Sequence, residues 1–183
     1  CGLQEGRPVV FVTGGSLGAR GINQGIEASL PKLKERGVQL IWQTGTPFFA
    51  QAGKAVEALG YTDCKVMEFV TRMDLAYAVA DLVVARAGAM SVSELCLVRL
   101  PAILVPLPTA AEDHQTMNAR ALTDRGAAIL VRDDRTVAEL GDVILDLLAD
   151  PNKLNGLRSA IAGMAISNAA GAIAAEVIRL ARQ

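Results

Sequence analysis

Short apolar runs alternate with longer amphipathic segments along most of the chain. Six short apolar, strand-like runs lie at residues 9–12, 39–43, 65–69, 82–85, 102–105 and 127–131, and such runs are typical of parallel strands covered on both faces. Helical patterns lie between them at 19–35, 47–59, 73–79, 91–97 and 113–125, and continue without strands at 137–148, 153–165 and 169–182. This order predicts α/β architecture: a doubly wound, Rossmann-like parallel sheet of about six strands with a C-terminal helical tail.

Composition supports one globular domain over residues 1–183 and excludes several classes of partner. Hydrophobic residues make up 51% of the chain and charged residues 20%, which is typical of a folded domain. The net charge is -1, no basic cluster occurs, and the few aromatic residues are scattered, so we expect no nucleic-acid partner. No apolar run is long enough to span a bilayer, so we expect no membrane contact by this domain.

The cysteines and acidic residues give no sign of a metal site. Cys1, Cys64 and Cys96 lack metal-ligand spacing, and we expect structural thiols in a reducing compartment. No Asp-x-Asp pair occurs, and Asp133-Asp134 is expected to be a solvated turn, so we expect no cofactor and no protein-held metal. Because the chain begins at Cys1 without a methionine and a strand follows closely, we expect a piece cut from a longer protein.

The segment after the first expected strand combines glycines with the start of a helix. Gly14, Gly15 and Gly18 allow a sharp turn of the backbone, and Ser16 adds a hydroxyl donor. A helix N-terminus presents unpaired N–H groups and partial positive charge, so this junction suits a phosphate. Glycine-rich turns also occur for packing reasons, so this loop alone leaves both interpretations open.

A second signal follows the fourth expected strand. Residues 87–89 read Ala-Gly-Ala, which lets a ligand approach the backbone, and we expect Ser91 to cap the next helix with Glu94 near its first turn. A carboxylate accepts two hydrogen bonds side by side and therefore matches a vicinal diol such as a ribose. Alternatively, Glu94 completes a capping box with Ser91. Arg86 has two interpretations as well, a phosphate contact or a structural ion pair.

Several motifs in a fixed order resemble the MurG family, the bacterial UDP-N-acetylglucosamine transferases that make lipid II from lipid I. They are Gly-Gly-Ser-Leu-Gly-Ala-Arg at 14–20, Phe-Val at 69–70 before Met73, the run at 80–94 that ends in Ser-Val-Ser-Glu, Pro-Ala-Ile-Leu-Val-Pro at 101–106, and Asp-His-Gln-Thr-Met-Asn-Ala at 113–119. The resemblance covers nearly the whole chain but only the C-terminal, nucleotide-sugar-binding half of that family. It therefore implies one half of a GT-B glycosyltransferase.

The resemblance also implies partners and a location. The donor would be UDP-N-acetylglucosamine, and the lipid I acceptor would bind through an N-terminal domain that this chain lacks. The full-length protein would act in the cytoplasm at the inner face of the plasma membrane. The last helical segment would pack toward the other domain, which would leave part of its apolar face exposed here.

Site residues carry over from the family position by position. The glycine loop would face the UDP phosphates, main-chain groups of the segment after the third strand would read uracil, and a carboxylate would hold the ribose hydroxyls. Two backbone amides would lie near the phosphates or the sugar, and the loop after the fifth strand would contact the sugar. In that order, the donor-binding residues are Gly15, Ser16, Leu17 and Gly18; Phe69 and Val70; Glu94; Ala89 and Met90; and His114 and Gln115.

His114 is the single candidate for acid–base catalysis in the chain, because imidazole titrates near neutral pH. The sequence places no carboxylate to orient it, although Glu112 and Asp113 are adjacent. In the resembling family, the acid–base residue lies in the N-terminal half. We therefore expect no catalytic residue in this domain, and we expect the domain alone to bind its donor without turnover.

Other classes of protein remain open as alternatives. One is a stand-alone donor-binding subunit that needs a membrane partner, and another is an enzyme similar to a UDP-N-acetylglucosamine 2-epimerase, which a single histidine fits poorly. A dinucleotide-binding domain is disfavoured, because the glycines do not follow Gly-x-Gly-x-x-Gly and the second strand ends at Gln43 without an acidic residue.

Overall fold

Six parallel strands form one sheet in the order β3-β2-β1-β4-β5-β6 in the computed structural model, which describes residues 2–182 (for Ala111, the backbone only). The strands are β1 (Val9–Thr13), β2 (Gln39–Gln43), β3 (Cys64–Met67), β4 (Leu82–Ala85), β5 (Ala102–Leu104) and β6 (Ile129–Leu130). The direction of winding reverses between β1 and β4, where a doubly wound sheet opens a crevice at its carboxyl edge. The predicted fold class is confirmed.

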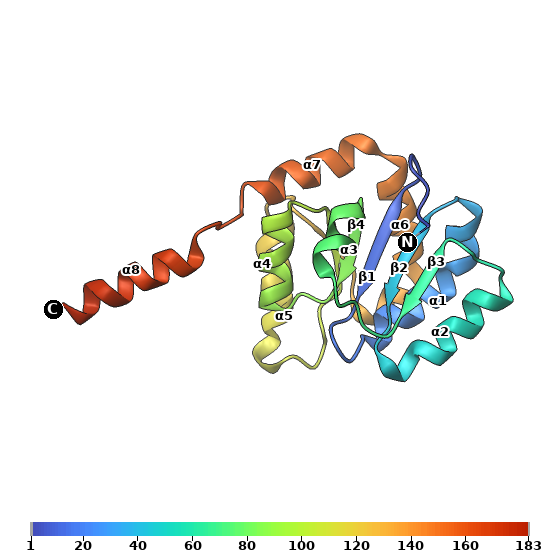
Figure 1. Ribbon diagram of the computed structural model, residues 1–183, viewed down its shortest axis with the longest axis horizontal. Helices are drawn as coiled ribbons and strands as arrows, with labels where there is room; N and C mark the ends of the chain where they lie inside the picture. Colours follow the sequence, from blue (N-terminus) through green and yellow to red (C-terminus); the bar gives the residue numbers. More distant parts are fainter. Residues whose placement is uncertain (1, 183) are drawn as a thin grey trace.

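Helices cover both faces of this sheet (Figure 1). They are α1 (Arg20–Glu35), α2 (Thr46–Ala58), α3 (Met73–Val79), α4 (Ala89–Val98), α5 (His114–Thr123), α6 (Thr136–Ala149), α7 (Pro151–Ala162) and α8 (Ala169–Ala181), with short 3-10 turns η1 (Ala111–Asp113) and η2 (Asp133–Arg135). Side chains from α1, α2 and α6 share one buried cluster with the sheet, and those from α3, α4 and α5 share the other. The domain therefore has three layers.

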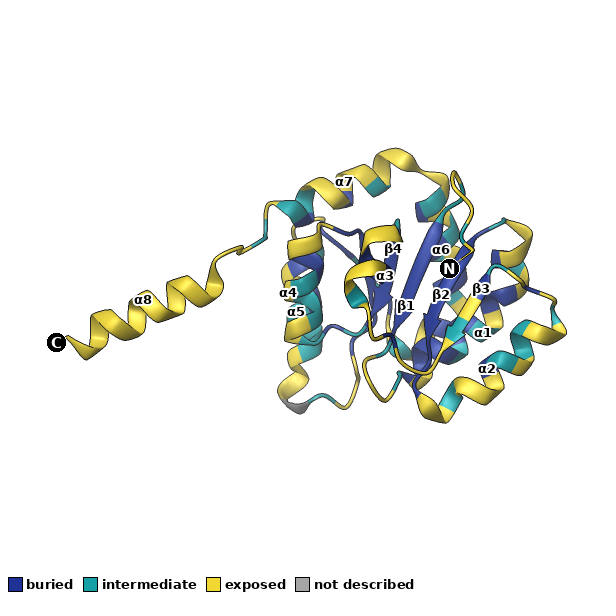
Figure 2. Ribbon diagram, viewed as in Figure 1, coloured by how far each residue is buried: buried dark blue, intermediate teal, exposed yellow. Residues whose placement is uncertain are grey.

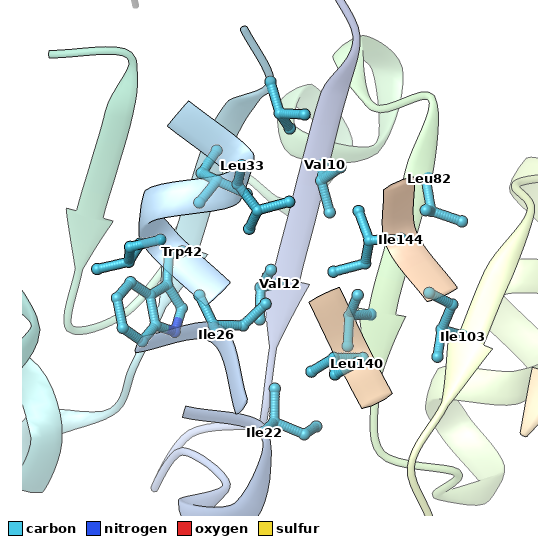
Figure 3. Close-up of a cluster of buried hydrophobic side chains, with 14 of the residues drawn as sticks. Val10, Val12, Ile22, Ile26, Leu33, Trp42, Leu82, Ile103, Leu140 and Ile144 are labelled. Carbon is cyan, nitrogen blue, oxygen red and sulfur yellow. The ribbon is translucent and has the colours of Figure 1, made fainter. Parts of the chain in front are cut away.

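Alternate residues of β1 point into the two clusters, as the pleat of a strand requires. Val10 and Val12 belong to the cluster beneath α1 and α6, where Figure 3 shows them beside Ile26 and Ile144. Phe11 belongs to the opposite cluster and is fully buried. Because both faces are covered, the strand is apolar at every position but the last, which explains its unbroken apolar run in the sequence.

The C-terminal helix α8 projects away from the three layers (Figures 1 and 2). None of its residues is buried, and its apolar side chains Ile173, Val177 and Leu180 are each more than half exposed. The expected exposed apolar face is thus present. No helix among the described residues is both long and apolar enough to cross a membrane.

Several predicted boundaries differ from the structure. The expected third strand at 65–69 is shifted to Cys64–Met67, so Phe69 and Val70 lie in the following loop. The expected sixth strand at 127–131 has only two paired residues, because Ala127 and Ala128 are buried against helices without joining the ladder. The predicted cap on α4 is wrong: the helix begins at Ala89, its N-cap is Gly88, and the Ser91 side chain does not cap it.

Candidate functional site

The loop between β1 and α1 folds into a tight turn that requires glycine. The Gly18 amide donates to the Gly15 carbonyl at 3.0 Å, and both residues have positive φ angles, +76° and +80°. A methyl group on Gly18 would overlap the Thr44 carbonyl, so the absent side chain lets this loop contact the loop after β2. Residues Ser16 and Leu17 at the tip of the turn are exposed, Leu17 by 81%.

The start of α1 lies directly behind this turn. Among the described residues, no side chain caps the helix, so its first N–H groups are available to a ligand. One acidic group lies close by: a methyl group on Gly21 would overlap the Asp133 carboxylate. Asp133 is paired with Arg86 at 2.5 Å, which offsets its negative charge beside the helix start.

Arg86 has a structural role in this pair. Its guanidinium also donates to the carbonyls of Val105 and Pro106, both at 3.1 Å, and its side chain is 12% exposed. Of the two interpretations of Arg86, the structural ion pair is confirmed. The expectation that Asp133 is merely solvated is wrong, because it joins η2 to the end of β4; Asp134 is exposed and pairs with Arg132.

Gln43 joins two of the predicted loops from the end of β2. Its Nε2 donates to the Gly15 carbonyl at 2.9 Å and to Thr13 Oγ1 at 3.3 Å, while its Oε1 accepts from the Val70 amide at 2.8 Å. The side chain is 2% exposed. A buried amide that satisfies three partners fixes the distance between the glycine loop and the segment after β3. Nothing in the sequence predicts this role, because Gln43 stands out there only as the non-acidic residue that ends the second strand.

Glu94 lies on the second turn of α4, and the predicted alternative of a capping box with Ser91 is absent. Instead, its Oε2 accepts a hydrogen bond from the Tyr77 hydroxyl at 3.0 Å. Burial raises the pKa of Tyr77, and the charge of Glu94 raises it further, so the phenol stays protonated and donates throughout the working pH range. The carboxylate therefore has one oriented oxygen, a contact that sequence reasoning missed.

The loop after β5 presents Gln115 on the first turn of α5. Its Oε1 accepts from the Leu107 amide at 3.0 Å, which orients the side chain amide. Its neighbour His114 begins the helix and is exposed. The adjacent Asp113 accepts from Thr116 at 2.6 Å. Further along α5, Asn118 donates to the Ala87 carbonyl at 3.0 Å and so ties this helix to the loop after β4.

A pocket of about 600 Å³ opens between the start of α1 and the loop after β5. Gly18 and Gln115 both line it, together with Arg20, Arg86 and Asp133. The other predicted residues lie outside its lining: on the tip of the same glycine loop, in the segment after β3, on α4 and at the start of α5. Phe69 and Met90 are 54% and 76% exposed there. Within the part of the chain that the structure describes, no cluster of three or more His, Cys, Asp or Glu residues could hold a metal ion.

Loops that gather at the switch point of a doubly wound parallel sheet are typical of nucleotide-binding domains. Residues 9–173 match the glycosyltransferase family 28 C-terminal domain, and the chain belongs to this family. It is 51% identical over 177 residues to the Porphyromonas gingivalis (strain W83) protein named UDP-N-acetylglucosamine–N-acetylmuramyl-(pentapeptide) pyrophosphoryl-undecaprenol N-acetylglucosamine transferase, covering 97% of this chain and 47% of that protein.

Solved structures agree with this assignment. The Acinetobacter baumannii MurG crystal structure superposes with a TM-score of 0.84 at 28% identity, covering 97% of this chain and 51% of that one. A putative UDP-N-acetylglucosamine 2-epimerase from Listeria monocytogenes has a TM-score of 0.59 at 14% identity over 85% of this chain and 40% of that one, which shows a shared fold alone. The chain thus spans about half the length of the MurG-type proteins it matches.

Proposed function

We propose that this chain is the donor-binding half of an inverting glycosyltransferase that moves N-acetylglucosamine from its UDP derivative to lipid I, making lipid II for peptidoglycan. The observation that supports this most directly is that the glycine loop, Glu94 and Gln115 follow β1, β4 and β5 and therefore share the carboxyl edge of one sheet. The relatives that carry the transferase name match this chain over nearly its full length.

In this proposal the glycine loop and the start of α1 hold the diphosphate. As UDP leaves the anomeric carbon, negative charge develops on the β-phosphate. N–H groups fixed at a helix start stabilise that charge without reorienting, so the loop contributes to the rate as well as to binding. Ser16, exposed at the tip of the turn, is the side chain that donates to the same phosphates.

The uridine is held between the segment after β3 and helix α4. The segment of Phe69 and Val70 reads uracil through main-chain groups other than the Val70 N–H, which already donates to Gln43. Glu94 accepts from the ribose hydroxyls with the carboxylate that Tyr77 orients.

The sugar lies toward α5. Because Leu107 occupies the Gln115 Oε1, the Gln115 NH2 group is the part that donates to a sugar hydroxyl. The backbone amides of Ala89 and Met90 at the start of α4 lie near the phosphates or the sugar, and exposed His114 is a further sugar contact.

The acceptor half of the reaction belongs to residues outside this chain. The lipid I site, the general base that deprotonates the acceptor hydroxyl and the membrane-facing surface are assigned to an N-terminal domain, at the inner face of the plasma membrane. Donor binding is proposed to need no metal. This half alone therefore binds UDP-N-acetylglucosamine and transfers nothing.

Calorimetric titration tests the proposal. The domain is titrated with UDP-N-acetylglucosamine, UDP-glucose, UDP and NAD, each with and without EDTA. We expect binding of the three uridine compounds, tightest for the N-acetylglucosamine derivative, and no loss in EDTA. A preference for NAD would contradict the proposal, and turnover of lipid I by the domain alone would contradict the division into halves.

Two variants, each with a matched control, assign the contacts. Glu94→Ala should weaken the binding of all uridine ligands. Glu27→Ala should not, because it removes a carboxylate of α1 that accepts hydrogen bonds from Gln51 of α2. Gln115→Ala should reduce the preference for the N-acetylglucosamine derivative over UDP, and Gln51→Ala is its control. Equal effects of a variant and its control would contradict the assigned contact.

A further inference from the structure

Tyr77 is a buried tyrosine whose hydroxyl faces the proposed ligand site. The side chain comes from α3 and is 8% exposed, yet its oxygen lies 3.0 Å from Glu94 Oε2 on α4. Most of the ring is in the apolar cluster between the sheet and α3, α4 and α5. The polar end of the residue therefore reaches Glu94 while the apolar body is fixed.

The ring is held by the central strand. Phe11 of β1, fully buried, meets Tyr77 edge-to-face with 5.6 Å between ring centroids and 76° between ring planes. Such pairs have a preferred geometry, which restricts how the ring can turn. Since β1 also leads into the glycine loop, the same strand orients the phosphate-facing turn and the tyrosine.

The residues that precede Tyr77 in the chain belong to the segment proposed to contact uracil. Val70 is buried in the same cluster, and α3 begins three residues later at Met73. One short helix thus connects the segment proposed to read uracil with the side chain that contacts Glu94. A nucleoside presents its base and its ribose at a fixed separation, which this connection can match.

A carboxylate on a half-buried helix turn, such as that of Glu94, samples several rotamers when nothing holds it. A hydrogen bond to one oxygen restricts these rotamers and leaves the lone pairs of the other oxygen to accept from a ribose hydroxyl. From this geometry we infer that Tyr77 is a positioning residue: it acts through Glu94 to set the preference for a ribose with both hydroxyls over a sugar without them. The inference rests on the proposed function.

The test compares UDP with 2′,3′-dideoxy-UDP. Dissociation constants are measured by calorimetry for the unaltered domain, Tyr77→Phe, Glu94→Ala and the double variant. We expect the unaltered domain to prefer UDP by on the order of 10- to 100-fold, the range of one hydrogen bond to a charged group. Tyr77→Phe should lower the ratio of the two dissociation constants by about three- to tenfold, chiefly by weakening the binding of UDP.

Two comparisons separate positioning from general stability. In the Glu94→Ala background, Tyr77→Phe should have no further effect on the ratio, because the carboxylate it orients is gone. Tyr61→Phe is the matched control: Tyr61 is 2% exposed and its hydroxyl donates to the Val38 carbonyl at 2.6 Å, at the opposite edge of the sheet. It should lower the unfolding midpoint without changing the ratio.

The outcomes are distinct. If the unaltered domain fails to bind UDP, the proposed function is wrong. If the unaltered domain binds UDP but Tyr77→Phe leaves the preference for UDP over 2′,3′-dideoxy-UDP unchanged, the proposed role of Tyr77 is wrong and the proposed function stands. The same conclusion follows if Tyr77→Phe weakens the binding of both ligands equally. Phe11→Leu provides a second variant that loosens the same ring, and an unchanged ratio there would also contradict the inference.

Discussion

Two buried glutamines at the ends of β2 show how single residues fix loops. Gln43 bridges Thr13, Gly15 and Val70 at the carboxyl edge, whereas Gln39, fully buried at the amino edge, bridges Gln4 and Arg7. In each, Nε2 donates to two partners and Oε1 accepts from one main-chain amide. A comparison of variants at the two positions can therefore distinguish the loss of stability on removing a buried amide from the effect on ligand binding.

Replacing either glutamine with leucine should reduce the free energy of unfolding by about 1–3 kcal/mol, because buried main-chain groups lose their partners. Only Gln43→Leu should also weaken UDP binding, since it alone holds loops of the proposed site. Urea unfolding and calorimetry measure the two effects. If Gln39→Leu weakened UDP binding as much as Gln43→Leu, the positioning role of Gln43 would be wrong.

Because the Cys64 thiol is buried, the free energy of unfolding should fall as the pH rises into the alkaline range. Burial raises the pKa of Cys64 to about 12. The unfolded thiol ionises near pH 8.5, so above that pH the unfolded state releases a proton that the folded state keeps, and stability falls by about 1 kcal/mol per pH unit. Burial raises the pKa of Cys96 in the same direction.

Urea unfolding under reducing conditions at about pH 8, 9 and 10 measures this slope. Cys64→Ala should be less stable than the unaltered domain at about pH 8 but should lose less stability on going to pH 10, since one of the thiols is gone. Burial also raises the pKa of Tyr61 and Tyr77, whose contribution begins at about pH 10, but it is the same in both proteins and does not affect their difference. Parallel pH profiles for the two proteins would contradict the prediction.

Among the structural elements, the glycine loop and the loop after β2 are in backbone contact. Gly18 packs on Thr44, and Gly45, also with a positive φ angle, packs on Leu17 in return. Thr44 is itself fixed, because its carbonyl accepts from Asn23 of α1, a 2% exposed side chain that also accepts from Trp42. The shape of the turn therefore depends on three elements together.

Gly18→Ala should cost more than the strain of its φ angle. Gly126 has a positive φ of +64° and nothing near its missing side chain, so Gly126→Ala measures the strain alone, about 1–2 kcal/mol. Gly18→Ala adds an overlap with the Thr44 carbonyl, so it should destabilise further and weaken UDP binding. Chemical denaturation and calorimetry check this, and equal losses in the two variants would contradict the close contact.

The strands and helices could be predicted where the pattern of apolar residues stays the same over a whole segment. Each of the six apolar runs corresponds to a strand, because burial on both faces leaves a run of mostly apolar residues. The helical segment at 73–79 coincides with α3, because burial on one face of a helix leaves a helical period. Helix starts were less predictable: Ser91 is a favoured capping residue, yet the N-cap of α4 is Gly88. Side chain bridges such as Gln43 to Val70 could not be predicted, because their partners are distant in sequence.

For the whole molecule, the described core is complete without α8. Ile161 of α7 is the last buried residue, and Met164 is the last that packs on a core cluster. Ending the chain after Ala165 should therefore leave the thermal unfolding midpoint unchanged to within about 2 °C, a small shift on the usual scale for such domains.

Ending the chain after Ala149 provides the comparison. It also removes α7, with buried Leu157 and Ile161, and should lower the midpoint by several degrees. Differential scanning calorimetry distinguishes the two truncations. A similar fall in both would show that α8 contributes to the stability of the three layers.

The central position of β1 has a kinetic consequence. Its neighbours β2 and β4 come from different parts of the chain, with Val9 beside Gln39 and Val10 beside Leu82. Such parallel pairings close long loops before they gain contacts, which slows folding. Because the glycine loop continues β1, it reaches its final shape only after both neighbours have joined. During refolding, the capacity to bind a diphosphate should therefore return in the slowest phase, after most helical signal has recovered.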